Sequence, residues 1–600
     1  MPNDYVSLRN LQFQLFEVLR ASELQEYAFF SEYDRESMQM AMEAALQLAD
    51  QYLYPYYREM DQKKAHYRDG EVWVHPAVKD AIRAMAEAGW IGAIDSYEAG
   101  GQQMPLTLLN AAVIIFNAAN PNIAPYAFLT QGAANLIRNF GSEELEQTYI
   151  PQMYAGKWQG TMALTEPQAG SSLSDLSTIA TPTGNGAYKL RGQKIYISGG
   201  DHTAAENVVH LALARIEGAP PGTRGISLFV VPKHRPDNGQ LVPNDVTTAG
   251  IYGKMGQKGY VAAHLMLGER DDCHGYLVGE PHKGLRYMFQ MMNEARIGTG
   301  VMAAATASAA YYASLNYANE RPQGRHLSKK DATQPPVLII EHADVRRMLL
   351  FQKAVVEGSI ALLMRCSHYA DVAGHEPDTE KKKRAHLLLE LLTPVAKSWP
   401  SEMGIFSVST GMQVLGGAGY TDDFPLEQYF RDIRVNSIYE GTTTIHGMDL
   451  LGRKMMMENG QAAQYFADEL QACTRQAAAV GPLKPFAEKL AEAAQGLQQT
   501  TMHLAELAMR EKPEVFLADA TLFLEYFGTI AIAWQWLEQA LVAQGALEKG
   551  AEGDEALFYQ SKLQTCRYFF EYELPKTCGL QQRLRSSERV TLETRPEELV

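Results

Sequence analysis

The sequence predicts a mainly helical protein with a small β-domain in its middle and an extra helical domain at its C-terminal end. Three observations predict this. Apolar residues recur at helical spacing up to about residue 159 and again from about residue 286. Between these positions lie short segments rich in β-branched residues, separated by Gly, Pro, Asn and Asp. The last 140 or so residues return to a helical mixture of Ala, Leu, Gln and Glu.

Composition narrows the class of protein. With 600 residues, 46% of them hydrophobic and 21% charged, the chain is long enough for several globular domains. A formal net charge of -16 argues against a general nucleic-acid surface or an anionic membrane. The five scattered cysteines form no CxxC pair, so neither a disulfide framework nor a metal site is expected. The N-terminus shows no signal peptide, and no run of eighteen apolar residues predicts a membrane span, so we expect a cytoplasmic protein.

The first 159 residues divide into an arm and a helical domain. In the arm, residues 1–33, an apolar stripe at helical spacing is too small to bury itself, so the arm should dock on a larger body. Residues 34–159 contain no alternating pattern of any length, so we expect an all-helical domain. Its main expected helices are 34–53, 106–119 and 133–140.

Residues 160–285 are the expected β-domain. Its clearest strands are 188–198, 208–215, 226–231 and 262–267. Residues 286–458 form a second helical domain, with long helices at 301–318 and 342–372 and a proline-containing surface loop at 321–336. Residues 459–600 are a C-terminal helical extension, whose charged tail from Arg583 is expected to be loose. We find no internal repeat.

Glu440 is the leading candidate for a catalytic residue. It follows Ile438 and Tyr439 and precedes the flexible Gly441, and an apolar pocket would raise the pKa of such a carboxylate toward that of a general base. Thr442 is expected to cap the helix that follows. These residues alone also fit an ordinary capping loop with a solvated glutamate.

Six further segments carry signals of their own: MALTEPQAGSS at 162–172, KIYISGG at 194–200, NEAR at 293–296, ERPQGR at 320–325, QVLGGAGY at 413–420 and YEGT at 439–442. A Gly/Ser turn such as the first offers amides and hydroxyls to a pyrophosphate or a ring edge. Together with the order of helical, β and helical segments over residues 35–455, these motifs resemble the acyl-CoA dehydrogenase family of flavoproteins. The extensions at both ends resemble the larger branch of that family, which includes 3-methylmercaptopropionyl-CoA dehydrogenases.

The resemblance implies FAD as cofactor and assigns residues to it. By position, Tyr196 would cover the flavin ring and Ser198 would face its N5, although Tyr196 could also be an ordinary strand aromatic. Arg321 would reach FAD phosphates across a subunit boundary, unless its segment is a plain solvated loop. The full set of implied cofactor contacts is Met162, Leu164, Thr165, Ser171, Tyr196, Ser198, Arg321, Gln323, Gln413, Gly416, Gly417, Thr442 and Thr444.

The resemblance also implies a substrate site and a base. Some family members carry the base directly before the arginine of the NEAR segment, but here that position is Ala295, and Glu294 lies one residue off. This leaves Glu440 as the matching base. The implied contacts to the acyl-CoA are Ser171, Asn293, Arg296, Tyr439 and Gly441.

The implied reaction is FAD-dependent α,β-dehydrogenation of an acyl-CoA to the trans-2-enoyl-CoA. Glu440 would remove the α-proton while hydride leaves the β-carbon for the flavin, with hydrogen bonds to the thioester carbonyl stabilising the developing enolate. The substrate would be 3-methylmercaptopropionyl-CoA or a fatty acyl-CoA. Electron-transferring flavoprotein would accept the electrons, and the protein would be a homodimer or homotetramer. Two alternatives are an acyl-CoA oxidase and a non-catalytic or nucleic-acid-binding protein of the same fold.

Overall fold

The computed structural model describes residues 5–184, 186–328 and 331–600. They form two compact units, one of Met1–Gln39, Leu106–Ala111 and Thr299–Val600 and the other of Met40–Pro105 and Ala112–Gly298. Helices come first along the chain, strands follow in the middle, and helices return and continue to the C-terminal end. This order confirms the predicted fold class.

The helices that precede the β-domain bury the predicted apolar faces. They are α2 (Arg35–Tyr52), α3 (Tyr57–Gln62), α4 (Ala77–Glu87), α5 (Leu106–Ala119), α6 (Ala124–Phe140) and α7 (Glu143–Tyr154). The first and third expected helices correspond to α2 and α6, and the second matches α5 residue for residue. Helix α6 begins nine residues earlier than predicted, with Pro125 in its first turn, where a missing N–H costs nothing.

The expectation of an all-helical domain over residues 34–159 is wrong at one hairpin. Strands β1 (His66–Arg68) and β2 (Glu71–Trp73) pair antiparallel around Asp69 and Gly70. Both turn residues have positive φ, 53° and 85°, as a type I′ turn requires. Strands of three residues are too short to show alternation, so the Asp-Gly pair was the only available sequence signal.

The β-domain is built on a sheet in the order β10-β11-β5-β12-β7-β6-β3, with β4 pairing with β5 and β6. The four predicted strands are confirmed as β5 (Ala187–Ser198), β6 (Asn207–Ile216), β7 (Ile226–Pro232) and β11 (Ala262–Leu267). Six more were not predicted: β3 (Trp158–Ala163), β4 (Ile179–Pro182), β8 (His234–Asp237), β9 (Gln240–Pro243), β10 (Val246–Ile251) and β12 (His274–Val278). Three of these contain proline, which weakens a strand signal in a sequence.

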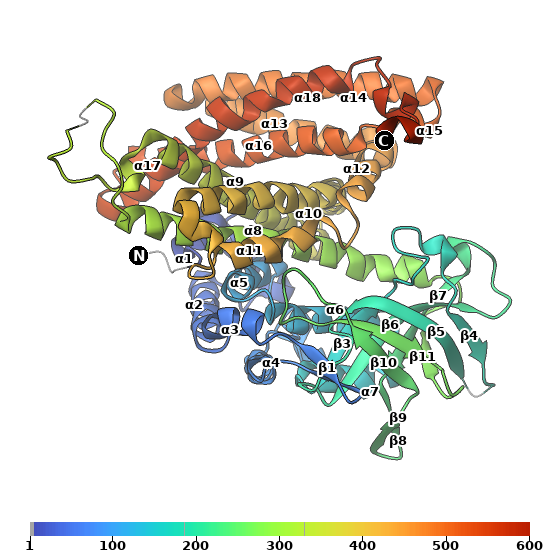
Figure 1. Cartoon of the computed structure of the whole chain (residues 1–600). Coiled ribbons are helices and arrows are strands. Elements are labelled where there is room, and N and C mark those ends of the chain that lie inside the picture. The colour runs from blue at the N-terminus through green and yellow to red at the C-terminus, as the bar shows by residue number, and fades with distance from the viewer. Residues whose placement is uncertain (1–4, 185, 329–330) are drawn as a thin grey trace. The chain divides into compact units, whose positions relative to one another are not determined.

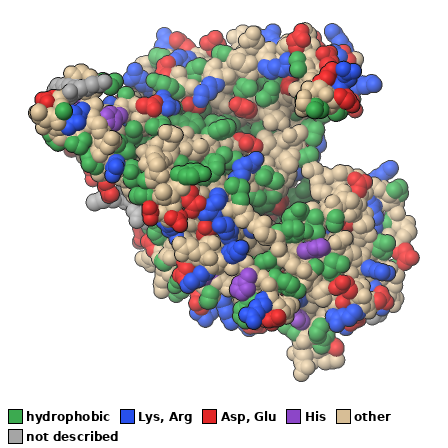
Figure 2. All heavy atoms as spheres, viewed as in Figure 1, with side chains coloured by type: hydrophobic (Ala, Val, Ile, Leu, Met, Phe, Trp, Pro, Cys, Tyr) green, Lys and Arg blue, Asp and Glu red, His purple; other side chains and the backbone are tan. Residues whose placement is uncertain are grey.

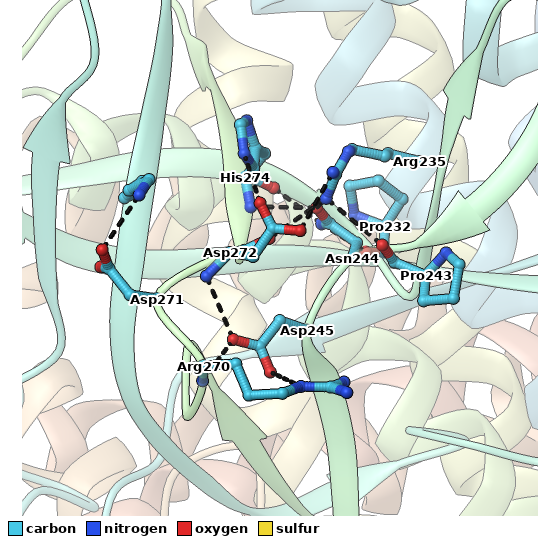
Figure 3. A network of polar contacts seen from close by, with 10 residues as sticks. Pro232, Arg235, Pro243, Asn244, Asp245, Arg270, Asp271, Asp272 and His274 are labelled. Carbon is cyan, nitrogen blue, oxygen red and sulfur yellow. Dashed lines mark hydrogen bonds and ion pairs between the residues drawn. The ribbon is translucent and has the colours of Figure 1, made fainter.

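A polar network closes the end of this sheet near the β8–β9 hairpin (Figure 3). The buried Asn244 side chain donates to the carbonyls of Pro232 and His274, both at 2.8 Å, and accepts from the His274 amide at 2.9 Å. The Asp245 carboxylate accepts from the Arg270 amide at 2.7 Å. These bonds satisfy backbone groups that the irregular turn before β12 leaves without ladder partners.

The long helices after the β-domain are α8 (Gly284–Glu320), α9 (Ala343–His375), α10 (Thr379–Leu415), α11 (Leu426–Ile433) and α12 (Thr443–Gly452). The two predicted long helices are confirmed within α8 and α9. The predicted loop at 321–336 is non-helical and largely exposed wherever it is described, and its residues 329–330 lie outside the described part.

The C-terminal extension adds α13 (Gln461–Ala478), α14 (Lys484–Arg510), α15 (Pro513–Phe516), α16 (Ala520–Glu548), α17 (Gly553–Tyr568), α18 (Thr577–Leu584) and α19 (Val590–Glu593). Helix α16 packs against α14, α17 and α18 (Figure 1). It buries Trp534 and Trp536. The tail that is expected to be loose from Arg583 is held at two positions, while most of its residues after Arg585 are exposed. Arg583 pairs with Asp519 at 2.8 Å and Arg589 with Glu511 at 2.8 Å, contacts between distant positions that a local reading cannot find.

The N-terminal arm docks on the C-terminal helices, as its apolar stripe predicts. It forms α1 (Leu8–Gln12) and a π-helical turn, Phe13–Val18. Gln14 donates to Gln539 of α16 at 2.8 Å. The buried Lys562 of α17 donates to Asn10 and, at 2.8 Å, to Glu357 of α9. A buried ammonium needs several acceptors, and here the arm, α9 and α16 each supply one.

The drawn surface carries charged side chains of both signs. On the face drawn in Figure 2, Lys and Arg side chains are interspersed with Asp and Glu side chains, so no large field of one sign covers it. Among the described residues, none of the helices combines the length and the hydropathy needed to traverse a bilayer.

Candidate active site

Glu440 lies in the first unit, in a short loop between a 3₁₀ turn, Arg434–Ser437, and helix α12. Its φ is 55°, a left-handed conformation that is uncommon for a residue with a side chain, and Gly441 follows at 85°. Glu440 is half-buried, whereas Ile438 is 53% exposed. Of the two residues predicted to form an apolar environment for the Glu440 carboxylate, only Tyr439 is partly buried within this unit.

Three contacts hold the loop. His446 Nε2 donates to the Glu440 carbonyl oxygen at 2.9 Å, and Lys397 Nζ donates to the Gly441 carbonyl oxygen at 2.8 Å. Both donors are fully buried. Thr442 Oγ1 accepts from the Ile445 amide at 3.4 Å, which confirms the predicted N-cap. Sequence reasoning missed the roles of both donors, and Lys397 has no local signal.

The loop has several polar neighbours. The Tyr439 hydroxyl lies 3.2 Å from Asn436 Oδ1, and burial, followed by the charge of Glu440, raises the pKa of Tyr439. Thr443 donates to Glu402 of α10. Thr444, a predicted FAD contact, is exposed and accepts a hydrogen bond from Thr521 of α16 at 3.4 Å.

The other predicted dinucleotide contacts of this unit are accessible. Gln413 is exposed at the end of α10, and Gly416 and Gly417 have no atom within 4 Å of where a Cβ would lie. Such bare backbone admits the close approach of a phosphate group. Arg321 and Gln323 are exposed in the loop after α8, where the Gln323 amide donates to Val337 at 2.8 Å. These features fit an FAD dinucleotide.

In the second unit, a buried ion pair joins the two segments predicted to contact the flavin. Lys194 Nζ of β5 lies 2.8 Å from Glu166 Oε1 and also donates to the Leu164 carbonyl at 3.1 Å. Burial is the largest influence on Glu166 and acts to raise its pKa, but Lys194 and donors from Thr178 and Ser177 together lower the pKa to about 2. The carboxylate is therefore ionised in the core.

A β-bulge lies at Tyr196 of β5, next to the residue that bonds to Thr165. The β5–β11 register shifts between Ala263 and Leu265, and Tyr196 has a φ of 58°. The Ile195 amide donates to the Thr165 carbonyl at 2.9 Å. The Tyr196 ring is 58% exposed and lies 4.2 Å from the Tyr252 ring. An exposed aromatic face at a strained position is available for stacking.

The remaining predicted cofactor residues of this unit differ in exposure. Ser198 ends β5 and is half-buried, while Ser171 lies exposed in the turn after Glu166. Leu164 is buried and Met162 is half-buried, and both pack in the core between α6 and the sheet. Their side chains fill the core, so any contact to a flavin from these two positions would come from backbone atoms or from the exposed part of Met162.

The NEAR segment lies on α8. Arg296 is buried and donates to Asn293 Oδ1 at 3.3 Å, so the two predicted substrate residues are in contact. Glu294 instead lies 3.4 Å from Asn135 of α6, and burial raises the pKa of Glu294 to about 7. The sequence analysis did not predict the contact between Glu294 and Asn135.

A polar cavity of about 250 Å³ lies elsewhere in the second unit, next to β2 and the start of β6. Asp201, His202, Lys233 and His234 line it, and Asp201 pairs with Lys233 at 2.7 Å. Its lining, taken over the described residues, includes none of the predicted cofactor or substrate residues.

The sequence matches four domain families along its length. These are the acyl-CoA dehydrogenase N-terminal domain at 35–157, middle domain at 161–269 and C-terminal domain at 282–456, and the acetyl-CoA dehydrogenase C-terminal-like domain at 466–595. The chain is 34% identical over 568 residues to 3-methylmercaptopropionyl-CoA dehydrogenase of Ruegeria pomeroyi, covering 94% of this chain and 95% of that protein. It is also 34% identical to a broad-specificity linear acyl-CoA dehydrogenase of Mycobacterium tuberculosis, with 95% of each covered.

Solved structures show the same fold. The crystal structure of Caenorhabditis elegans ACDH-11 in complex with C11-CoA matches with a TM-score of 0.77 at 19% identity, covering 94% of this chain and 91% of that one. An acyl-CoA dehydrogenase complexed with FAD from Bacillus anthracis matches with a TM-score of 0.71 at 20% identity, covering 93% of each. From the domain matches and the relatives covered end to end, the chain belongs to the acyl-CoA dehydrogenase family, FAD-dependent oxidoreductases that act on CH–CH groups.

Proposed function

We propose that this protein oxidises an acyl-CoA to the trans-2-enoyl-CoA with Glu440 as the catalytic base. The observation that carries the proposal is the conformation of Glu440, which is left-handed, half-buried and held at its own carbonyl and at the next one. Strained backbone that its surroundings maintain is a frequent property of catalytic residues. When bound, FAD accepts the hydride that leaves the β-carbon of the substrate.

The chain's own residues divide the remaining work. Thr165, Tyr196 and Ser198 would hold the flavin ring, and Arg321, Gln413 and Gly416 the dinucleotide. Tyr439 and Gly441 border the carboxylate that takes the α-proton. An α-proton beside a thioester is weakly acidic, so hydrogen bonds to the thioester carbonyl must stabilise the enolate, and the Glu440 amide is our candidate donor.

Substitution Glu440→Gln tests the base. The variant keeps the shape of the side chain but cannot take a proton, so kcat should fall by about 10³-fold while FAD content stays unchanged. Glu458→Gln is the matched control, because Glu458 is also a glutamate with positive φ, 48°, but lies beyond α12 and pairs with Lys383. Near-wild-type turnover in Glu440→Gln would refute the assignment.

For the substrate, we propose a saturated acyl-CoA, with 3-methylmercaptopropionyl-CoA and linear fatty acyl-CoAs as candidates. Support comes from the relatives that match end to end, which are named for 3-methylmercaptopropionyl-CoA, for butyryl-CoA and for broad linear specificity. A panel of these thioesters, mixed anaerobically with the holoenzyme while flavin absorbance is followed, would rank them. If none bleaches the flavin, the protein does not oxidise these acyl-CoAs.

We further propose that electrons pass to electron-transferring flavoprotein rather than to oxygen. The YEGT segment resembles the dehydrogenase form of the family signature. Substrate-reduced enzyme should react slowly with oxygen and rapidly with the flavoprotein or a dye. Stoichiometric hydrogen peroxide at a comparable rate would identify an oxidase instead.

A further inference from the structure

We propose that His446 and Lys397 are positioning residues for Glu440, and that the C-terminal extension sets the position of His446 through the contact of α12 with α16. The inference rests on the proposed role of Glu440 as base. It assigns to two buried side chains, and to the extension, a function in the reaction that does not require any of them to touch the substrate.

The backbone at Glu440 requires support. Glu440 and Gly441 have φ values of 55° and 85°, and a residue with a Cβ pays steric energy for such a conformation. Two consecutive carbonyl groups, those of Glu440 and Gly441, each accept a hydrogen bond from a fully buried side chain. Because these bonds orient two successive peptide planes, they restrict the direction in which the Glu440 side chain leaves the backbone.

His446 supports the loop from α12. A carbonyl oxygen can only accept, so the 2.9 Å contact requires the proton on His446 Nε2. A Cβ placed on Gly441 would lie 2.8 Å from the same Nε2, so the ring packs directly against the loop backbone. Glycine at position 441 therefore permits both the positive φ and the close approach of the imidazole.

Lys397 supports the loop from α10. Its ammonium reaches the Gly441 carbonyl at 2.8 Å, and a charged donor makes a stronger bond than a neutral one. The same helix presents Glu402 to the Thr443 hydroxyl. Helix α10 therefore holds the chain on both sides of Thr442, the N-cap of α12.

The extension holds α12 itself. Gly447 follows His446, and a Cβ on Gly447 would lie 2.6 Å from the Ala520 carbonyl oxygen at the start of α16. Thr521 adds a hydrogen bond to Thr444 at 3.4 Å. Only the absence of a side chain at 447 allows this approach, so the start of α16 fixes how deeply α12, and with it His446, sits in the unit.

The test uses the full-length holoenzyme and four variants: His446→Leu, His446→Gln, Lys397→Met and Gly447→Ala. Two rates are measured. One is kcat, with KM, for the best acyl-CoA. The other is exchange of the α-hydrogens of a 3-thia-acyl-CoA with D₂O, followed by mass spectrometry. A sulfur at the β-position has no hydride to lose, so this exchange reports proton removal by Glu440 alone.

If His446 and Lys397 position Glu440, His446→Leu and Lys397→Met should lower both rates by about 10- to 100-fold, with KM and FAD content nearly unchanged. His446→Gln keeps an N–H donor and should recover part of the loss. Gly447→Ala should lower both rates by pushing α12 off α16. Lys562→Met is the control for loss of a buried ammonium in the same unit, and it should lower the Tm but leave both rates intact.

The outcomes separate the two proposals. Wild-type rates in His446→Leu and Lys397→Met would overturn the positioning roles. Wild-type rates in Gly447→Ala would overturn the role of the extension. If His446→Leu folds poorly, His446→Gln and Lys397→Met are compared instead. A positioning role predicts that kcat falls in these variants while KM stays nearly unchanged. Glu440→Gln is measured in parallel. If exchange persists in Glu440→Gln, Glu440 is not the base. If exchange is lost in Glu440→Gln but His446→Leu keeps wild-type rates, only the positioning role is rejected.

Discussion

Glu166 and Lys194 form an ion pair with a 2.8 Å separation in which the two side chains are 1% and 0% exposed. Lys194 also donates to the carbonyls of Leu164 and Leu213, and Glu166 accepts from the amides of Ser177 and Thr178. Two loops and two strands thus converge on one pair. Lys194 is two residues from Tyr196, and Glu166 directly follows Thr165, so the pair connects both segments proposed to hold the flavin ring.

Breaking this pair should damage stability and cofactor binding together. Lys194→Met leaves the Glu166 carboxylate buried without its cation, so we expect a loss of about 3–5 kcal/mol in the free energy of unfolding. We also expect weaker FAD binding, measured by flavin fluorescence during dilution. Glu166→Gln should also destabilise the protein, because it leaves Lys194 without a counter-charge and turns an NH₂ group toward donors from which the carboxylate accepts.

A matched control is Lys189→Met on the same strand as Lys194, because it removes an ion pair, 3.0 Å apart, with the exposed Asp271 of the loop before β12. This change should cost no more than about 1 kcal/mol and leave FAD affinity unchanged. Equal effects of the Lys194 and Lys189 substitutions would show that burial of the pair is unimportant.

Asp371 gives the stability of the protein a defined pH dependence. It is buried on α9 and accepts from the Leu106 and Thr107 amides at the start of α5, at 2.7 and 2.9 Å. Burial raises the pKa of Asp371 from 3.8 to about 7. Between these values the folded protein holds a proton on Asp371 that the unfolded chain releases, so the contribution of Asp371 to the free energy of unfolding falls as pH rises from about 4 to 7.

The slope from this one group approaches about 1.4 kcal/mol per pH unit. Asp371→Asn removes the titration, so the variant should gain stability relative to wild type as pH rises from 4 to 7, measured by urea unfolding at several pH values. Asp378→Asn is a control of opposite sign. Amide hydrogen bonds at the start of α10, those from Lys381 above all, lower the pKa of Asp378, so its contribution is present above its unfolded pKa and is lost as pH falls. A constant difference between Asp371→Asn and wild type would contradict the prediction.

The proposed role of Arg321 leads to a prediction about the oligomeric state. Its guanidinium is exposed in the loop after α8, and if it binds phosphates of a neighbouring subunit's FAD, the active protein is at least a dimer. Light scattering should give a dimer or tetramer, and Arg321→Gln should weaken FAD binding by about tenfold or more. Arg325→Gln is the matched control, because Arg325 donates to the Ala332 and Gln334 carbonyls within its own loop. A monomer with full FAD occupancy would exclude a shared site.

The hydrophobic pattern predicted the long, well-buried elements and missed several short strands. Helix α5 matches its expected bounds because a continuous, mostly apolar segment is buried on nearly every side, and strand β11 does so because its buried and half-buried residues alternate. Hairpin β1–β2 and the proline-containing strands β4, β8 and β9 are short or partly exposed, and they exist because a neighbouring strand offers a pairing edge. The two ion pairs that hold the tail were missed for a related reason, since Asp519 and Glu511 are far away in the sequence.

By itself, the sequence determined the order of domains, the family and the identity of Glu440 as candidate base, because these depend on local motifs and composition. It also determined the Thr442 cap, which needs only a hydroxyl three residues before an amide. Only the tertiary structure decided what holds Glu440 in place. Lys397 lies 44 residues from Gly441, and Glu166 lies 28 from Lys194. Such pairs form because burying one charge or carbonyl requires a partner, and any distant segment that packing brings near can supply it.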